Sequence, residues 1–317
     1  MFFRKNSYLS ILIPLILLLS SCQKSKNDKP VQNNDLQITP VSQVNTPEVK
    51  VGILNITSAA SVNERYRPLL DYLEESLDRK FELVTLSQET QFTQVAANNL
   101  DFIINNPLAA VQVQRLYNTE FLVTHSKPST GALFSGLIIV RQDSEIENPT
   151  DLKGKQVVCV NFQTAAAGCV FQIYHLKQQG IDPFESFENF LENKSQDNIV
   201  LAVLNGTVDA GFIRTGQLEK MIAQGLINDA SELRILDRAE DNFYYAHTTA
   251  LYPEWPVAAL EATDPQLAQE VKQALLNIPS DHPALNAAKL QGFVPVADYQ
   301  PLNLLIEDLQ LKSWDKK

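Results

Sequence analysis

The chain has 317 residues, with 37 acidic and 26 basic side chains and a formal net charge of −11 at neutral pH. An acidic chain without clustered Lys and Arg is poorly suited to nucleic acid, because basic side chains must neutralise the phosphates. The length exceeds the roughly 250–300 residues at which single cores stop growing, so we expect one large domain or two lobes.

Residues 1–21 have the pattern of a secretory signal. Arg4 and Lys5 precede an apolar run from Leu9 to Leu19, which is shorter than the roughly 20 residues that span a bilayer. The sequence Leu19-Ser20-Ser21-Cys22 resembles the lipobox of bacterial lipoproteins, which implies that Cys22 is acylated and becomes the new N-terminus. The alternative is an ordinary signal peptide with an incidental cysteine.

Residues 22–47 are expected to form a lipidated cysteine and a disordered tether, because they are polar, contain proline and lack an apolar period. Loss of residues 1–21 removes Arg4 and Lys5 and no acidic residue, so the mature net charge is −13. A random coil of this length reaches about 25–30 Å, which would hold the folded part just off a lipid surface.

Strands and helices alternate in the first half of the folded part. The apolar positions Tyr66, Leu69, Leu70 and Leu73 follow the helical period. Strands are expected at Val49–Leu54, Phe81–Leu86 and Asp101–Ile104, with helices around residue 66 and at Gln88–Asn98. This alternation is typical of βαβ units and predicts a mainly parallel sheet.

The alternation then repeats. Strands are expected at Leu137–Val140, Gln156–Val160 and Val208–Ile213, with helices at Ala166–Gln179, Asn198–Asn205 and Thr215–Gln224. Gly180 and Gly225 end two of these helices, because glycine readily adopts the left-handed conformation of a helix terminus. Beyond residue 245 the chain is expected to become helical, at Asp264–Asn277, Pro283–Gln291 and Asp298–Leu309.

Cys159 and Cys169 stand ten residues apart in a chain that we expect to be exported. A disulfide is possible in an oxidising compartment. Cys159 also lies in an apolar, strand-like run, where a free cysteine packs as a small hydrophobic residue. The sequence leaves both interpretations open.

No catalytic motif is present in the mature sequence. The four histidines show no pair at the i, i+4 spacing of a helical zinc site. The patterns G-x-S-x-G, H-E-x-x-H and G-x-x-x-x-G-K are absent. We therefore expect a protein that is not an enzyme, with no cofactor and no metal site.

Four polar loops each follow a strand and begin a helix. Ligands of open α/β sheets bind beyond the carboxyl ends of strands, where helix N-termini offer free N–H groups. Taken singly, such a loop is more often a helix cap than a binding site, but four together favour a binding cleft. The candidate ligand-binding residues in three of them are Thr57, Ser58, Asn105, Asn106, Gln163 and Thr164.

The sequence resembles the periplasmic binding proteins of phosphate, phosphite and phosphonate importers from about Val49 to Pro279. The motifs that carry this resemblance are Glu64-Arg65-Tyr66-Arg67-Pro68-Leu69, Asp151–Lys155, Leu201–Gly206 and Val208–Gly211. Three further segments are similar to the branch that serves as extracellular sensor domains of histidine kinases, including tetrathionate sensors: Asp101–Pro107, Ile213–Glu219 and Leu251–Pro256.

The resemblance implies a two-lobed α/β fold, the type II periplasmic binding protein, with two hinge-crossing strands that close on a ligand. It places lobe 1 at residues 48–136 plus 250–317 and lobe 2 at residues 137–249. The crossings are expected near Phe134–Arg141 and Tyr245–Leu251.

Several family positions depart from the phosphonate pattern. Phosphonate binders carry Ser-Thr-Ser before the glycine that opens the lobe 2 helix, whereas this chain has Ala165-Ala166-Ala167 before Gly168. The family tyrosine after the third-strand proline falls at Ala110, and the family Ser-His-Asp reads Ser195-Gln196-Asp197, with Asp197 kept as a candidate. An unpaired buried acceptor costs about 1–3 kcal/mol, so an aminoalkylphosphonate is a poor fit.

Arg214 is the sharpest candidate, together with its neighbour Thr215. Arg214 ends a buried strand, and its planar guanidinium suits a sulfonate, phosphate or carboxylate. The alternative is a structural ion pair with Asp209 or Glu219. His247 and Ser135 lie on the two expected crossings, where each either contacts ligand or forms structural hydrogen bonds.

These observations favour a lipid-anchored solute-binding protein on the extracytoplasmic face of the cell envelope, in the periplasm of a diderm. Its ligand is expected to be a small anion of the phosphonate, phosphate or sulfur-oxyanion class. Its partner is expected to be the permease of an ABC importer. The alternative is a ligand-sensing receptor that partners a histidine kinase or cyclase.

Overall fold

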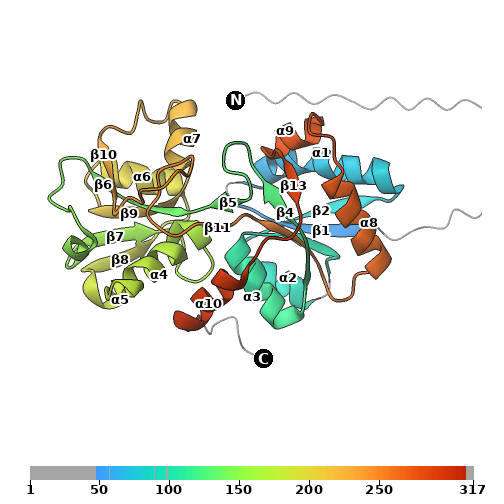
Figure 1. Cartoon of the computed structure of the whole chain (residues 1–317), viewed down its shortest axis with the longest axis horizontal. Coiled ribbons are helices and arrows are strands. Elements are labelled where there is room, and N and C mark those ends of the chain that lie inside the picture. The colour runs from blue at the N-terminus through green and yellow to red at the C-terminus, as the bar shows by residue number, and fades with distance from the viewer. Residues whose placement is uncertain (1–47, 57, 89, 98, 312–317) are drawn as a thin grey trace, which may run out of the picture. The chain divides into compact units, whose positions relative to one another are not determined.

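The structure is a computed structural model and describes residues 48–311 except Thr57, Glu89 and Asn98. The expected signal peptide, the lipidated Cys22 and the tether lie outside the described residues. The described chain forms a six-stranded sheet, a five-stranded sheet and a two-stranded ribbon (Figure 1). We call the part built on the six-stranded sheet lobe 1 and the part built on the five-stranded sheet lobe 2.

The lobe 1 sheet has the strand order β13-β4-β12-β3-β1-β2. Its strands are β1 (Val49–Leu54), β2 (Phe81–Leu86), β3 (Phe102–Ile104), β4 (Glu120–Ser126), β12 (Pro256–Ala259) and β13 (Gly292–Val294). The pairs of β1 with β2 and β3 are parallel, whereas β12 pairs antiparallel with β3 and β4, and β13 pairs antiparallel with β4. The sheet is therefore mixed.

Helices cover both faces of this sheet. They are α1 (Ala59–Leu77), α2 (Thr90–Ala96), α3 (Pro107–Tyr117), α8 (Pro265–Leu276), α9 (Pro283–Ala288) and α10 (Gln300–Asp308). Phe102 and Ile104 pack in one core with α1, α8 and α9, while Ile103 packs in the other with α2, α3 and α10. This is the alternation that the two-residue period of a strand imposes.

The lobe 2 sheet has the order β10-β6-β9-β7-β8. Its strands are β6 (Gly136–Arg141), β7 (Gln156–Cys159), β8 (Asn189–Glu192), β9 (Ala210–Arg214) and β10 (Leu233–Leu236). Its helices are the 3₁₀-helix η1 (Pro149–Leu152), the π-helix η2 (Ala166–Val170), α4 (Phe171–Gln178), α5 (Pro183–Ser186), α6 (Gln196–Leu204) and α7 (Gln217–Ala223). As the sequence predicts, Gly180 beyond α4 is left-handed, with φ of 76°.

Two short strands connect the lobes. β5 (Leu133–Phe134) pairs antiparallel with β11 (Tyr252–Pro253) between the two larger sheets (Figure 1). The two-lobed fold with two crossing strands is therefore confirmed. The exact lobe boundaries remain a prediction.

The lobes also share an apolar core. Phe171 of α4 stacks on Tyr252 with ring centroids 4.0 Å apart, and it meets Phe134 edge to face at 5.5 Å. Side chains of η2 in lobe 2 and of α3 and α10 in lobe 1 belong to the same buried cluster. One aromatic ring of lobe 2 thus packs against both crossing strands.

Two expectations about secondary structure are wrong. The sheets are mixed rather than mainly parallel, and the region beyond residue 245 contributes β11, β12 and β13 as well as helices. The reason is that β12 and β13 are short apolar segments whose antiparallel pairing depends on residues far away in the sequence. A strand this short carries little periodic signal of its own.

Candidate functional site

The polar loops of lobe 1 begin its helices. Ser58 is exposed, and its hydroxyl accepts from the Ser61 N–H at 3.2 Å to cap α1. Asn106 caps α3 by accepting from the Ala109 N–H at 3.0 Å. Thr57, the remaining candidate before α1, lies outside the described residues. Helix capping therefore accounts for the side-chain oxygens of Ser58 and Asn106.

Asn105 and Asn106 are both buried where β3 ends. The Asn105 Nδ2 donates to Gln91 Oε1 at 2.6 Å, while its Oδ1 has no hydrogen-bond partner among the described residues. Asn106 Nδ2 donates across to lobe 2, to the Thr164 carbonyl at 3.0 Å. Gln112 of α3 donates to the Gln163 carbonyl at 3.1 Å. The loops after β3 and β7 therefore meet directly.

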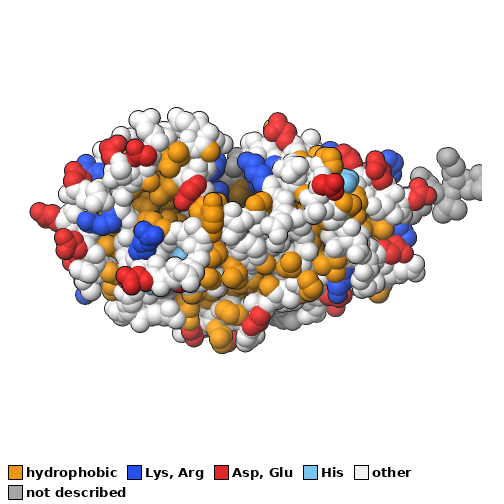
Figure 2. Space-filling model, turned by 45° about the horizontal axis from the view of Figure 1, so that its top comes forward, with side chains coloured by type: hydrophobic (Ala, Val, Ile, Leu, Met, Phe, Trp, Pro, Cys, Tyr) orange, Lys and Arg blue, Asp and Glu red, His pale blue; other side chains and the backbone are white. Residues whose placement is uncertain are grey.

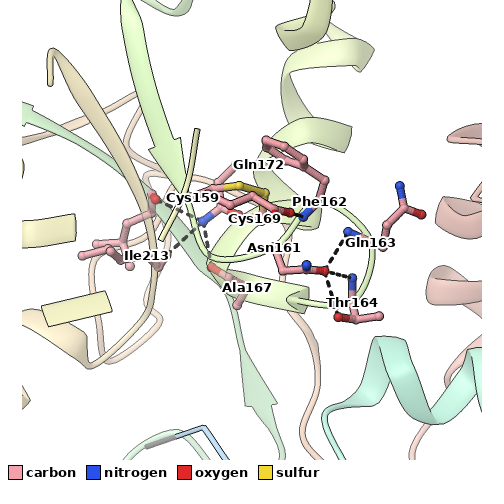
Figure 3. The surroundings of a disulfide bond; sticks show 11 residues. Cys159, Asn161, Phe162, Gln163, Thr164, Ala167, Cys169, Gln172 and Ile213 are labelled. Atoms are coloured by element: carbon pink, nitrogen blue, oxygen red, sulfur yellow. Dashed lines mark hydrogen bonds between the residues drawn. A yellow bond between two sulfur atoms is a disulfide. The ribbon is translucent and has the colours of Figure 1, made fainter. Parts of the chain in front are cut away.

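A disulfide between Cys159 and Cys169 closes the loop that carries Gln163 and Thr164 (Figure 3). This resolves the alternatives that the sequence leaves open. Inside the loop, Asn161 Oδ1 accepts from the N–H groups of Gln163 and Thr164 and from the Thr164 hydroxyl, at 2.9 to 3.1 Å. The Thr164 hydroxyl, the one hydroxyl in this loop, therefore already donates its hydrogen bond to Asn161.

The three alanines before Gly168 are buried, with exposed fractions of 3% to 6%. Ala166 and Ala167 belong to the core shared with lobe 1. A hydroxyl at these positions would need a hydrogen-bond partner in that apolar contact. Alanines in place of Ser-Thr-Ser are therefore suited to the apolar contact between the lobes.

Ser135, His247 and Thr215 form a hydrogen-bonded group at the crossings. The Ser135 hydroxyl lies 2.7 Å from the Thr249 carbonyl and 3.3 Å from His247 Nδ1, and its N–H donates to Thr215 Oγ1 at 3.2 Å. His247 Nδ1 also faces the Thr249 carbonyl at 2.8 Å, while its Nε2 faces the Asp241 carboxylate at 3.0 Å. These buried groups hold the two crossing segments together.

Asp197 lies at the first turn of α6. Its carboxylate accepts from Lys220 Nζ at 2.8 and 3.0 Å and also from Gln217 Nε2. The residue proposed from the family's Ser-His-Asp position is therefore neutralised by α7 of its own lobe.

Arg214, at the end of β9, lacks such neutralisation. Its Nη1 donates to the Thr215 carbonyl at 2.9 Å, and no described carboxylate forms an ion pair with it. Neither alternative ion pair, with Asp209 or with Glu219, is found among the described residues. The Asp209 carboxylate accepts instead from the Gln156 N–H at 2.8 Å. Burial lowers the pKa of Arg214, and the nearby positive charge of Arg65 lowers it further, while the carboxylate of Glu254 acts against both.

Lys127 and Glu254 form an ion pair on the lobe 1 side. Lys127 Nζ, just beyond β4, lies 2.6 Å from Oε1 of Glu254, whose side chain is 1% exposed. Burial lowers the pKa of Lys127; Glu254 opposes this shift, and the charges of Arg214 and Arg65 add to it. Lys127 nevertheless keeps 32% of its side chain exposed, so that part of it remains accessible to solvent.

Arg65 is the third cation of this group. It projects from α1, where Nη2 donates to the Ala288 carbonyl at 2.9 Å and the guanidinium lies over the Tyr66 ring. Its Nε is buried without a hydrogen-bond partner among the described residues. We call Arg65, Lys127, Arg214 and Glu254 the cation cluster. Figure 2 shows Lys and Arg side chains on both sides of the hollow between the lobes.

Sequence reasoning found Arg214 but missed Arg65, Lys127 and Glu254. A usable signal was Glu254 itself, a carboxylate inside the apolar segment Tyr252–Pro256. A buried carboxylate needs a cationic partner. The sequence does not say which cation supplies it.

A separate pocket of about 300 Å³ lies between α4 and the end of α10. Aromatic and aliphatic side chains dominate its lining, which includes Phe162, Phe184, Leu309 and Leu311. Its cation, Lys177, is paired with Asp182 at 3.0 Å. An anion therefore has a stronger electrostatic reason to bind at the cation cluster than in this pocket.

Within the described ranges, no group of three or more His, Cys, Asp or Glu side chains is arranged to hold a metal ion. None of the helices in this part of the chain combines the length and apolarity needed to cross a bilayer.

The model of one protein family matches residues 51–300. That family is described as the periplasmic substrate-binding protein of phosphonate ABC transporters. The chain belongs to this family. The resemblance seen in the sequence is therefore confirmed, and the family places the chain among extracytoplasmic binding proteins rather than enzymes.

A curated relative comes from the sensing branch. The chain is 28% identical over 280 residues to the tetrathionate sensor histidine kinase TtrS of Salmonella typhimurium. The match covers 83% of this chain and 46% of the kinase. The chain thus spans about half the length of this relative.

Solved structures of two other proteins share the fold. XAC2383 from Xanthomonas citri, bound to chloride, has a TM-score of 0.70 and 19% identity, covering 83% of this chain and 98% of that one. PhnD1 from Prochlorococcus marinus, in complex with methylphosphonate, has a TM-score of 0.66 and 16% identity, with the same coverage of 83% and 98%. At sequence identities of 19% and 16%, the similarity shows that the fold is shared and nothing about the ligand.

His125 provides a pH test of this environment. It is 1% exposed, and burial lowers its pKa to about 3, with smaller contributions from Lys127 and Arg65. Because the unfolded chain binds a proton near pH 6.5 and the folded chain does not, stability is lost as pH falls from about 6.5 to 3, by at most about 1.4 kcal/mol per unit.

His125→Phe should weaken this acid sensitivity, since the ring already packs against Tyr66, Trp255 and Phe293. Urea unfolding at several pH values between 7 and 4 measures the effect. Wild type should lose more free energy of unfolding than the variant across this range. Equal losses would show that His125 stays unperturbed.

Proposed function

We propose that this chain is a lipid-anchored, extracytoplasmic solute-binding protein that captures a small anion between its two lobes and presents it to the permease of an ABC importer. The proposal that the ligand is an anion rests on Arg214, which lies at the carboxyl end of β9 without a carboxylate partner among the described residues. Burial without a paired carboxylate makes this cation costly, and a bound anion would offset that cost.

The proposed ligand class is phosphonate, phosphate or a sulfur oxyanion. Guanidinium groups bind planar or tetrahedral oxyanions through paired, charge-assisted hydrogen bonds. PhnD1 holds methylphosphonate, and the kinase relative is named for tetrathionate. The alanines at 165–167 and the engaged Thr164 hydroxyl support an anion held mainly by cations rather than by a hydroxyl-rich loop.

Signal transfer to a kinase or cyclase is the second candidate function. It is favoured by the match to the sensor kinase, which covers 83% of this chain. Ligand-driven closure serves either partner, because a ligand that prefers the closed state shifts the equilibrium toward it. Deleting the gene separates the two: loss of ligand uptake supports import, whereas loss of a transcriptional response with normal uptake supports sensing.

Arg214→Gln should weaken anion binding about 10- to 100-fold, because a hydrogen bond to a charged group contributes about 1.5–3 kcal/mol. Calorimetric titration of the mature protein with phosphate, methylphosphonate, sulfate, thiosulfate and tetrathionate measures this. Arg79→Gln is a matched control, since Arg79 is partly exposed and lies 4.0 Å from Glu270. Unchanged affinity in Arg214→Gln would remove this residue from the site.

Cys22→Ser should release the protein from the membrane fraction, because the proposed acyl chains attach to the Cys22 thiol and N-terminus. Fractionation of cells that express each form, with labelled palmitate as a second readout, checks this. Wild type should be labelled and sediment with membranes, and the variant should do neither. Equal sedimentation and labelling would contradict lipidation.

A further inference from the structure

The strand pairings bring two members of the cation cluster, Arg214 and Glu254, to the same crossing. β11 and β5 pair so that Tyr252 lies opposite Phe134, and Glu254 follows two residues beyond Tyr252. β6 and β9 pair so that Gly136, two residues beyond Phe134, lies opposite Arg214. The position of Arg214 in lobe 2 and that of Glu254 in lobe 1 are therefore both fixed by strand pairing at the same crossing.

The charges in the cation cluster do not balance. Three cations face one carboxylate, and that carboxylate is already 2.6 Å from Lys127. The guanidinium groups of Arg65 and Arg214 each donate one hydrogen bond to a backbone carbonyl, which carries no net charge. The Arg65 Nε remains buried and unpaired among the described residues. The excess of two positive charges calls for an anion.

We infer that Arg65 and Lys127 of lobe 1 and Arg214 of lobe 2 form one binding site for a doubly charged small anion, with Glu254 positioning Lys127. This rests on the proposed function and adds its residues and ligand charge. An anion held by all three cations links the lobes, because its contacts come from α1, from the end of β4 and from β9.

Glu254 then has a defined role. It fixes Lys127 beside the site and at the same time reduces the positive charge that the ligand meets. Because the carboxylate is buried, its attraction for Lys127 is only weakly screened by solvent. Removing Glu254's charge should therefore strengthen binding of a dianion, whereas removing any of the three cations should weaken it.

The experiment titrates sulfate and tetrathionate, and chloride as a monoanion, into wild type, Arg65→Gln, Lys127→Met, Lys127→Arg and Glu254→Gln at low ionic strength. Lys153→Met is the matched control, because Lys153 is exposed on lobe 2. Arg65→Gln and Lys127→Met should each lose about tenfold or more in dianion affinity, the size expected for a charged hydrogen bond. Lys127→Arg should retain binding, and Glu254→Gln should bind dianions more tightly.

Lys127→Met leaves Glu254 buried without its partner and risks unfolding. The double variant Lys127→Met with Glu254→Gln removes the pair together, so that circular dichroism should show a folded protein with weakened dianion binding. Wild-type affinity for the dianions in Arg65→Gln and in the double variant would overturn this inference and leave an Arg214-based anion site standing. Wild type that binds none of these anions, and neither phosphate nor methylphosphonate in the titration above, would overturn the proposed function as well.

Discussion

One buried carboxylate, Glu254, faces three cations where the two lobes are joined, and the electrostatics of the molecule depend on this imbalance. The side chain of Glu254 is 1% exposed and is paired with Lys127. Burying a charge is tolerable only with an opposite charge beside it. Burial lowers the pKa of Lys127 and of Arg214, and the neighbouring positive charges lower both further. A bound anion would remove the same penalty, which is why the arrangement favours ligand capture.

The rest of the fold holds these charges in position. The β5–β11 ribbon aligns the two crossings, and the Ser135–His247–Thr249 hydrogen bonds fix them from inside. Phe171 and the alanines before Gly168 make the lobe contact apolar. Packing therefore takes the place of the hydroxyls that phosphonate binders carry in this loop, and we propose that the cations carry the affinity. The disulfide between Cys159 and Cys169 holds the loop that makes this packing.

Local patterns were sufficient to predict many of the helices and strands, whereas the two-lobed architecture was implied by the family resemblance. The helical period of Tyr66, Leu69, Leu70 and Leu73 and the strand alternation around Ile103 are visible in the sequence, because burial on one face imposes a period. Arg214 was also identifiable, as a cation that ends an apolar strand. Lys127 and Glu254 were not, because their contact joins residues far apart in the chain and only the ribbon's register brings them together. The antiparallel strands β12 and β13 were missed for the same reason.

The measurement that tests the central claim most directly is the position of a bound anion. Crystals of the mature protein grown with selenate, measured at the selenium absorption edge, give that position from anomalous scattering. This account predicts an anomalous peak within hydrogen-bonding distance of Arg65, Lys127 and Arg214. A peak beside the loop of residues 161–168 instead, with none at the cation cluster, would contradict it.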